Sequence, residues 1–153
     1  MNWARFSVSA AAFLALGTGA FAADIAPAEV PFTDDGVTVS LTGMPGDPGK
    51  GASIFKDRKL GNCLACHANE AMSGELFHGE VGPPLDGVAD RWSEAELRAI
   101  VTDSKKALSD ETVMPGFYSL ELGKNVADSF VGKTILTAQQ VEDVVAYLAT
   151  LKE

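Results

Sequence analysis

The sequence predicts an all-α domain at residues 47–153, preceded by an irregular N-terminal extension at residues 23–46. Two segments of the domain begin with capping-box signatures and continue with apolar residues at helical spacing. Only one short run alternates apolar and polar residues as a half-buried strand does. The helical segments are separated by stretches rich in Gly and Pro, which favour loops. A domain of about a hundred residues holds one small core, so a second domain is not expected.

The first residues are predicted to form an export signal at 1–22. Arg5 supplies a positive charge, residues 6–16 are mostly apolar, and Ala20-Phe21-Ala22 offers small residues around a cleavable bond. The alternative is a membrane anchor, because residues 6–23 carry no charge and approach the roughly 20 apolar residues that span a bilayer. Polar and glycine residues inside that run favour cleavage, after which no membrane segment is expected.

The chain is acidic, with 12 Lys and Arg against 21 Asp and Glu and a formal net charge of −9. Loss of Arg5 with the signal leaves 11 basic against 21 acidic side chains, a formal charge of −10. Such a charge argues against nucleic acid as a partner, because phosphates attract cations. It permits docking to a basic partner surface, although an acidic surface also keeps exported proteins soluble.

The residues at 23–46 hold too few apolar side chains to fold alone, so this extension should wrap on the domain or on a partner. Within it, residues 37–41 could pair as a short strand. The first helix is expected to start at Pro48 with Asp47 as its cap, and to end between residues 57 and 61. It therefore ends immediately before the two cysteines of the chain.

Two further helices are predicted from their caps. Ser93 with Glu96, and Thr137 with Gln140, have the spacing of a capping box. The residues that follow at helical spacing are Leu97, Ile100, Val101, Ser104 and Leu108 in the first helix, and Val141, Val144, Val145, Leu148 and Leu151 in the second. Irregular loops are expected at residues 79–87 and around Met114, where the following proline disfavours helix.

The sequence Cys63-Leu-Ala-Cys66-His67 is a C-x-x-C-H motif, which is typical of covalent c-type haem attachment. Two intervening residues let both thiols reach the vinyl carbons on one porphyrin edge. The next side chain then lies beneath the ring, where its imidazole can bind iron. The motif thus predicts one haem c, attached through Cys63 and Cys66 and ligated by His67.

Four other interpretations of the cysteine pair compete with haem attachment. A disulfide across two intervening residues would stabilise the fold little, and a thioredoxin-like redox pair would need strands alternating with helices. A zinc site would need four ligands, and beyond the motif only His78 and carboxylates remain. Two free buried cysteines are the last alternative, which the adjacent His67 and the polar Asn62 disfavour.

The opposite side of the iron is predicted to be ligated by Met114, because a thioether commonly completes an electron-transfer haem. The competing candidates are Met44, Met72 and His78. Met44 belongs to the extension, and Met72 follows the motif too closely to reach around the macrocycle. His78 lies between Phe77 and Gly79, which is the setting of a surface loop residue. Methionine ligation would raise the reduction potential relative to two histidines and fill the position that small ligands would use.

The axial histidine needs an acceptor for its other ring nitrogen, and the carbonyl of Pro83 or Pro84 can provide one. Arg91 is a candidate partner for a haem propionate, although an arginine ahead of a helix is as often plain surface. The haem would also supply buried apolar area that a small, loop-rich core lacks, so the chain without it should be largely unfolded.

Several blocks of the sequence resemble class I cytochromes c. They are Gly51 and Phe55, Cys63-Leu-Ala-Cys66-His67, Gly82-Pro-Pro-Leu-Asp-Gly87, Met114, and Ala146-Tyr-Leu148. The resemblance covers the chain from Asp47 to its C-terminus. It implies the class I cytochrome c fold, with helices and loops around one covalent haem, a crossing of the first and last helices, and a proline carbonyl bonded to the haem histidine.

Three longer strings resemble the monohaem SoxX cytochromes of bacterial sulfur oxidation. They are residues 59–67, 79–92 and 112–118. This resemblance implies a periplasmic heterodimer with a SoxA-like haem subunit, acting as an L-cysteine S-thiosulfotransferase that conjugates thiosulfate oxidatively to a carrier-protein cysteine. The haem of this subunit would pass electrons to a soluble acceptor, and the chain would not be catalytic alone. The alternative is a free-standing, diffusible periplasmic cytochrome c that donates electrons to an oxidase.

Overall fold

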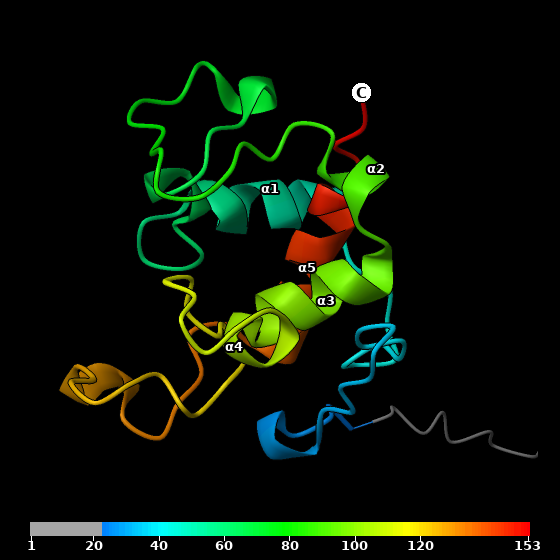
Figure 1. Ribbon diagram of the computed structural model, residues 1–153, viewed down its shortest axis with the longest axis vertical. Coiled ribbons are helices and arrows are strands. Elements are labelled where there is room, and N and C mark those ends of the chain that lie inside the picture. Colours follow the sequence, from blue (N-terminus) through cyan, green and yellow to red (C-terminus); the bar gives the residue numbers. More distant parts are fainter. Residues whose placement is uncertain (1–22) are drawn as a thin grey trace, which may run out of the picture.

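Residues 23–153 are described by a computed structural model, shown in Figure 1. The predicted signal at 1–22 lies outside the described residues. From residue 23 onward the chain forms helices and loops, with no strand and one isolated bridge between Thr33 and Gly36. The all-α prediction is confirmed. Across the same residues, no helix has both the length and the apolar character needed to span a bilayer.

The helices follow in chain order. The α-helices are α1 (Pro48–Lys56), α2 (Val88–Arg91), α3 (Glu94–Thr102), α4 (Ser104–Ala107) and α5 (Ala138–Leu148). The 3-10 helices are η1 (Pro27–Glu29), η2 (Cys63–Ala65), η3 (Glu70–Met72) and η4 (Asp128–Phe130).

The three predicted helix starts are confirmed by their caps. Asp47 accepts hydrogen bonds from two amides of the first turn of α1. Ser93 with Glu96 at α3, and Thr137 with Gln140 at α5, each form a complete capping box. These bonds satisfy amides that the first turn of a helix leaves without partners, which explains why the starts could be located from sequence.

The helix that begins after Ser93 does not continue to Leu108 as its apolar spacing suggested. It ends at Thr102, and Asp103 has an extended backbone with φ −153°. The Asp103 carboxylate accepts a hydrogen bond from the amide of Lys105, so that a separate short helix, α4, begins at Ser104. This bond from the aspartate side chain to the backbone therefore interrupts the helix at residue 103.

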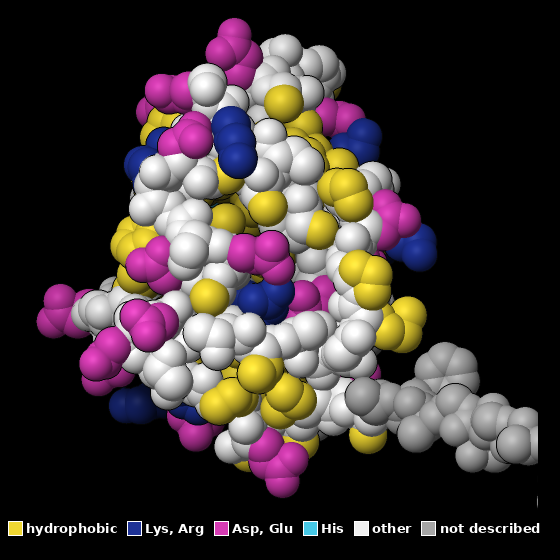
Figure 2. Space-filling view, turned by 90° about the vertical axis from the view of Figure 1, so that its right-hand side faces the viewer, with side chains coloured by type: hydrophobic (Ala, Val, Ile, Leu, Met, Phe, Trp, Pro, Cys, Tyr) yellow, Lys and Arg dark blue, Asp and Glu magenta, His cyan; other side chains and the backbone are white. Residues whose placement is uncertain are grey.

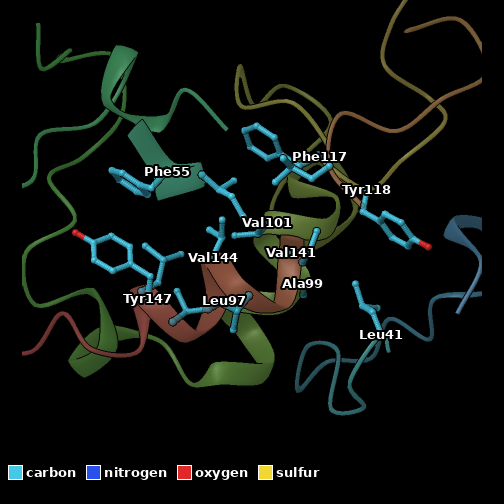
Figure 3. Close-up of a cluster of buried hydrophobic side chains, with 14 of the residues drawn as sticks. Leu41, Phe55, Leu97, Ala99, Val101, Phe117, Tyr118, Val141, Val144 and Tyr147 are labelled. Carbon is cyan, nitrogen blue, oxygen red and sulfur yellow. The ribbon is translucent and has the colours of Figure 1, made fainter. Parts of the chain in front are cut away.

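The first and last long helices, α1 and α5, cross at Gly51. A Cβ atom added there would lie 1.9 Å from the carbonyl oxygen of Asp143, so only glycine permits this approach. Beside the crossing, the rings of Phe55 and Tyr147 pack edge to face with centroids 5.4 Å apart. Figure 3 shows these rings within the core that α1, α3 and α5 share.

The N-terminal extension wraps on the domain, beside α3 and α5 (Figure 1). Val37 and Leu41 are completely buried. The Val37 amide donates to the carbonyl of Ala95 over 3.0 Å, and the Leu41 amide donates to a carboxylate oxygen of Glu142 over 2.7 Å. The strand expected at 37–41 was therefore wrong, because these backbone groups bond to helices rather than to another strand.

A buried ion pair joins the extension to α3 and α5. Arg98 Nε lies 2.9 Å from Glu142 Oε1, and both side chains are almost completely buried. Arg98 also donates to the carbonyl of Val37 over 3.0 Å and to the partly exposed Glu94 over 2.6 Å. On the face seen in Figure 2, acidic side chains lie at several separate places on the surface.

Candidate functional site

The C-x-x-C-H motif forms one compact turn. Cys63 begins η2, and its carbonyl accepts the amides of Cys66 over 3.0 Å and of His67 over 2.9 Å. Asn62, in the left-handed conformation with φ 49°, turns the chain from α1 into this segment. Leu64 lies between the two cysteines and is buried in the core, so it attaches the turn to the core. The two cysteines and the histidine are thus brought together by local structure.

Both cysteines are free thiols rather than a disulfide. Burial raises the pKa of the Cys63 thiol to about 12, so without a haem this group is neutral at physiological pH. Redox-active cysteine pairs instead carry a thiol with a lowered pKa, because the thiolate is the reactive form. The thiol chemistry of the turn therefore disfavours the thioredoxin-like interpretation.

His67 is held so that one ring nitrogen is available to a metal. Its Nδ1 lies 2.7 Å from the carbonyl oxygen of Pro83, as the sequence suggested. Since a carbonyl can only accept, Nδ1 carries the proton and Nε2 keeps a lone pair, which is the tautomer that a metal ligand needs. Gly82 packs against the ring, because a Cβ atom added there would lie 2.3 Å from His67 Cε1.

Arg91 has a role that sequence reasoning missed. Its guanidinium donates to the carbonyl oxygens of Asp86 over 2.7 Å and Pro84 over 2.9 Å. These bonds fix the loop that carries Pro83, the acceptor for His67. The guanidinium is therefore committed to positioning backbone, whereas the sequence had suggested only a propionate or a plain surface role. The sequence shows that Arg91 follows Pro84 and Asp86 closely. It does not show that the loop turns their carbonyl oxygens toward the guanidinium.

Met114 lies on the irregular loop after α4, half-buried and packed against the core. The Ser104 hydroxyl donates to its carbonyl oxygen over 2.6 Å. Just beyond it, the amides of Phe117 and Tyr118 donate to the carbonyls of Val101 and Thr102 at the end of α3. The loop is therefore attached to the core on both sides of the methionine.

The competing ligand candidates have other roles. Met44 is 52% exposed in the extension, and Met72 lies in η3 against the core. Both ring nitrogens of His78 are bonded to backbone, Nδ1 accepting the Asn69 amide over 3.3 Å and Nε2 lying 3.1 Å from the Met72 carbonyl. Within residues 23–153, no three His, Cys, Asp or Glu side chains are grouped as a metal site would require. The zinc interpretation thus has no support here.

The residues present fit a haem c. Two free thiols three positions apart suit thioether attachment, and His67 offers a lone pair on Nε2. Gly82 lets its loop pack directly against the imidazole, where a larger side chain would displace the ring. The sulfur of Met114 belongs to a chain segment anchored to the same core. This donor set contains the imidazole and thioether that electron-transfer haems use.

Comparison with known proteins points in the same direction. Residues 49–152 match the family model of cytochrome c. The solved structure of SoxXA from P. pantotrophus is 46% identical, with a TM-score of 0.79, over 86% of this chain and 100% of that one. A cytochrome c2 from Rhodopseudomonas palustris is 33% identical over an alignment of 119 residues, and the match covers 69% of this chain and 99% of that protein.

Proposed function

This chain belongs to the cytochrome c family, with a SoxX-like sequence, and on that premise we propose that it is an exported electron-transfer subunit of a thiosulfate-conjugating complex. One observation carries the proposal: the chain shares 46% identity with the full length of a chain in the SoxXA structure. We propose that the chain is divided accordingly into an export signal at 1–22, an extension at 23–46 and a haem domain at 47–153.

One haem c is proposed to be attached through Cys63 and Cys66, with His67 and Met114 as axial ligands. The chemistry that a bound haem supplies is the reversible uptake of one electron by its iron. The protein's part is to orient the ligands and to exclude others. Pro83 holds the histidine tautomer, and a methionine ligand fills the remaining position and raises the potential relative to a second histidine.

An exposed apolar loop next to the motif supports a protein partner. Leu76 is 76% exposed and Phe77 is 75% exposed, although both are large apolar residues. The loop is held against η2, because the Gly79 amide donates to the Leu64 carbonyl over 2.8 Å. Adjacent exposed apolar groups commonly mark interaction sites. We assign this loop to the interface with a SoxA-like haem subunit.

The backbone at Phe77 supports the same assignment. Its φ is 68°, a conformation that a bulky side chain adopts at a cost of about 1 kcal/mol or more. Arg58 lies over the ring with 5.4 Å to its centroid, which offsets part of this cost. A residue kept exposed in an unfavourable conformation is more readily explained by function than by stability of the isolated chain.

Co-purification tests the partner. A tagged chain produced with a SoxA-like subunit in a thiosulfate-oxidising host should elute as a heterodimer that supports thiosulfate oxidation. In Phe77→Gly, the affinity should fall about tenfold or more, as expected for loss of an aromatic anchor. The isolated variant should be no less stable than the wild type, because glycine adopts positive φ freely. Val131→Gly, at a 63% exposed position of a loop that carries no proposed ligand, is the control.

A free-standing cytochrome c that donates to an oxidase is the second candidate, favoured by the cytochrome c2 relatives at 33% identity. This second function predicts that the protein is a monomer that reduces an oxidase. Deletion of its gene should then leave thiosulfate oxidation intact. That result would contradict the proposed subunit role. The haem itself is tested separately, since both functions need it: a pyridine haemochrome spectrum and the mass of the exported protein should show one attached macrocycle.

A further inference from the structure

We propose that Ser104 is a positioning residue for the axial methionine, holding the backbone of Met114 so that its sulfur stays available to the haem iron. The inference rests on the proposed ligand role of Met114 and adds a residue that the motif does not contain. The inference is about how this chain positions the segment around Met114, whose sulfur would ligate the haem iron.

The hydrogen bond is short, and its donor is completely buried. Ser104 Oγ lies 2.6 Å from the Met114 carbonyl oxygen, and the Ser104 residue has no exposed surface. A serine hydroxyl in a helix usually bonds within its own turn or to solvent. This hydroxyl instead crosses ten positions to the ligand loop, so the bond orders a segment that has no regular structure of its own.

The break between α3 and α4 places this hydroxyl. Asp103 closes α3 with its backbone amide and opens α4 with its side chain, so Ser104 is the first residue of a new helix. The same break brings Asp103 close to the ligand loop: a Cβ added at Gly116 would lie 3.1 Å from the Asp103 carboxyl carbon. A continuous helix, as the apolar spacing suggested, would give Ser104 a different direction.

The loop has few other ways to fix the methionine. Residue 115 is proline, which has no amide proton, so the backbone next to Met114 cannot donate on that side. The neighbouring attachments are at Thr112, whose carbonyl accepts from Lys105 Nζ over 2.5 Å, and at Phe117, which donates to Val101 over 3.2 Å. Between these two points, the Ser104 bond is the one that holds the ligand residue itself among residues 23–153.

A thioether is a neutral and weak ligand, so its occupancy of an axial position depends on how well the protein presents it. When the backbone is preorganised, little ordering remains to be done on ligation. When it is loosened, the fraction of molecules with a vacant position grows. An added ligand that competes for that position then binds with a higher apparent affinity, in proportion to the vacant fraction.

Imidazole binding to the oxidised, haem-loaded protein measures this fraction. The weak long-wavelength absorption band that reports sulfur ligation should be present in the wild type and in Ser104→Ala. Imidazole should bind Ser104→Ala about tenfold more tightly than the wild type, because the Met114 carbonyl loses its partner and the ligand loop is less well ordered. Ser104→Thr keeps the hydroxyl and should stay near the wild-type affinity, although its extra methyl group lowers thermal stability.

Thr102 provides a matched control two residues away. Its residue is 1% exposed, and its Oγ1 has no hydrogen-bond partner within residues 23–153. Thr102→Val removes a buried hydroxyl from the last residue of α3, just before the break, without removing a bond, so imidazole affinity should change less than twofold. An equal shift in Thr102→Val and Ser104→Ala would mean that general loosening, not the bond to Met114, is responsible.

Three other results would also overturn the inference. The first is wild-type imidazole affinity in Ser104→Ala. The second is an imidazole affinity in Ser104→Thr about tenfold above that of the wild type. Because this comparison needs only the wild type, it also decides the matter if the alanine variant fails to fold. The third is absence of the band in the wild type, which removes Met114 from the ligand set. Only this third result contradicts the proposed site as well.

Discussion

Replacing Glu142 by glutamine should destabilise the protein more than any surface charge change, because Glu142 neutralises a buried arginine. Arg98 Nε lies 2.9 Å from one Glu142 oxygen, and the exposed fractions of the two side chains are 7% and 4%. The glutamine variant keeps the size of the side chain but leaves the guanidinium without its buried counter-charge. Removing one partner of such a pair costs about 3–5 kcal/mol.

The matched control uses the same arginine. Glu94 also contacts Arg98, over 2.6 Å, but its side chain is 63% exposed. In Glu94→Gln the loss should be about 0.2–1 kcal/mol, as for other exposed pairs on one helix face. In urea unfolding of the haem-loaded protein, the Glu142 variant should lower the midpoint by about 2–3 M for a denaturant slope of about 1.5 kcal/mol per M. The control should lower it by less than about 0.7 M.

A double variant separates charge burial from hydrogen bonding. Arg98→Met with Glu142→Leu removes both charges, so it should recover part of the loss. It still leaves the Leu41 amide without the Glu142 oxygen that accepts it over 2.7 Å, at a cost of about 1–3 kcal/mol. The amide hydrogens of the extension around Leu41 should therefore exchange faster in the double variant than in Glu142→Gln, whose side-chain oxygen can still accept from Leu41. Equal stability of the two single glutamine variants would refute the reasoning.

Three further perturbations follow from close contacts and from burial. Gly51→Ala places a Cβ 1.9 Å from a carbonyl oxygen of α5 and should lower stability by about 3 kcal/mol in urea unfolding. Gly82→Ala places one 2.3 Å from His67 Cε1 and should reduce the yield of haem-loaded protein, whereas Gly74→Ala, with nothing within 4 Å, should not. Burial raises the pKa of Tyr147, so stability is complete below about pH 10 and falls as pH rises toward the folded-state pKa. Tyr147→Phe should weaken that alkaline fall in the urea midpoint, and an unchanged fall would contradict this origin.

The helix starts and the ligand motif could be predicted because each depends on residues close in sequence. A cap requires one side chain within three positions of the amide it accepts, as at Ser93 and Thr137. The cysteines and His67 lie within one turn, so their proximity follows from the chain itself. The break at Asp103 was missed, because the apolar spacing continues through it while the aspartate bonds locally.

By itself, the sequence determined the fold class, the helix starts, the C-x-x-C-H motif at residues 63–67 and the family resemblance. The tertiary structure decided where residues distant in sequence meet. The Arg98–Glu142 pair, the burial of the extension, and the Ser104 hydroxyl on the Met114 carbonyl all join segments whose spacing carries no periodic signal. Local hydrogen bonds leave a pattern in the sequence because their partners keep a constant separation. Long-range contacts leave none, because their geometry depends on how every intervening loop folds.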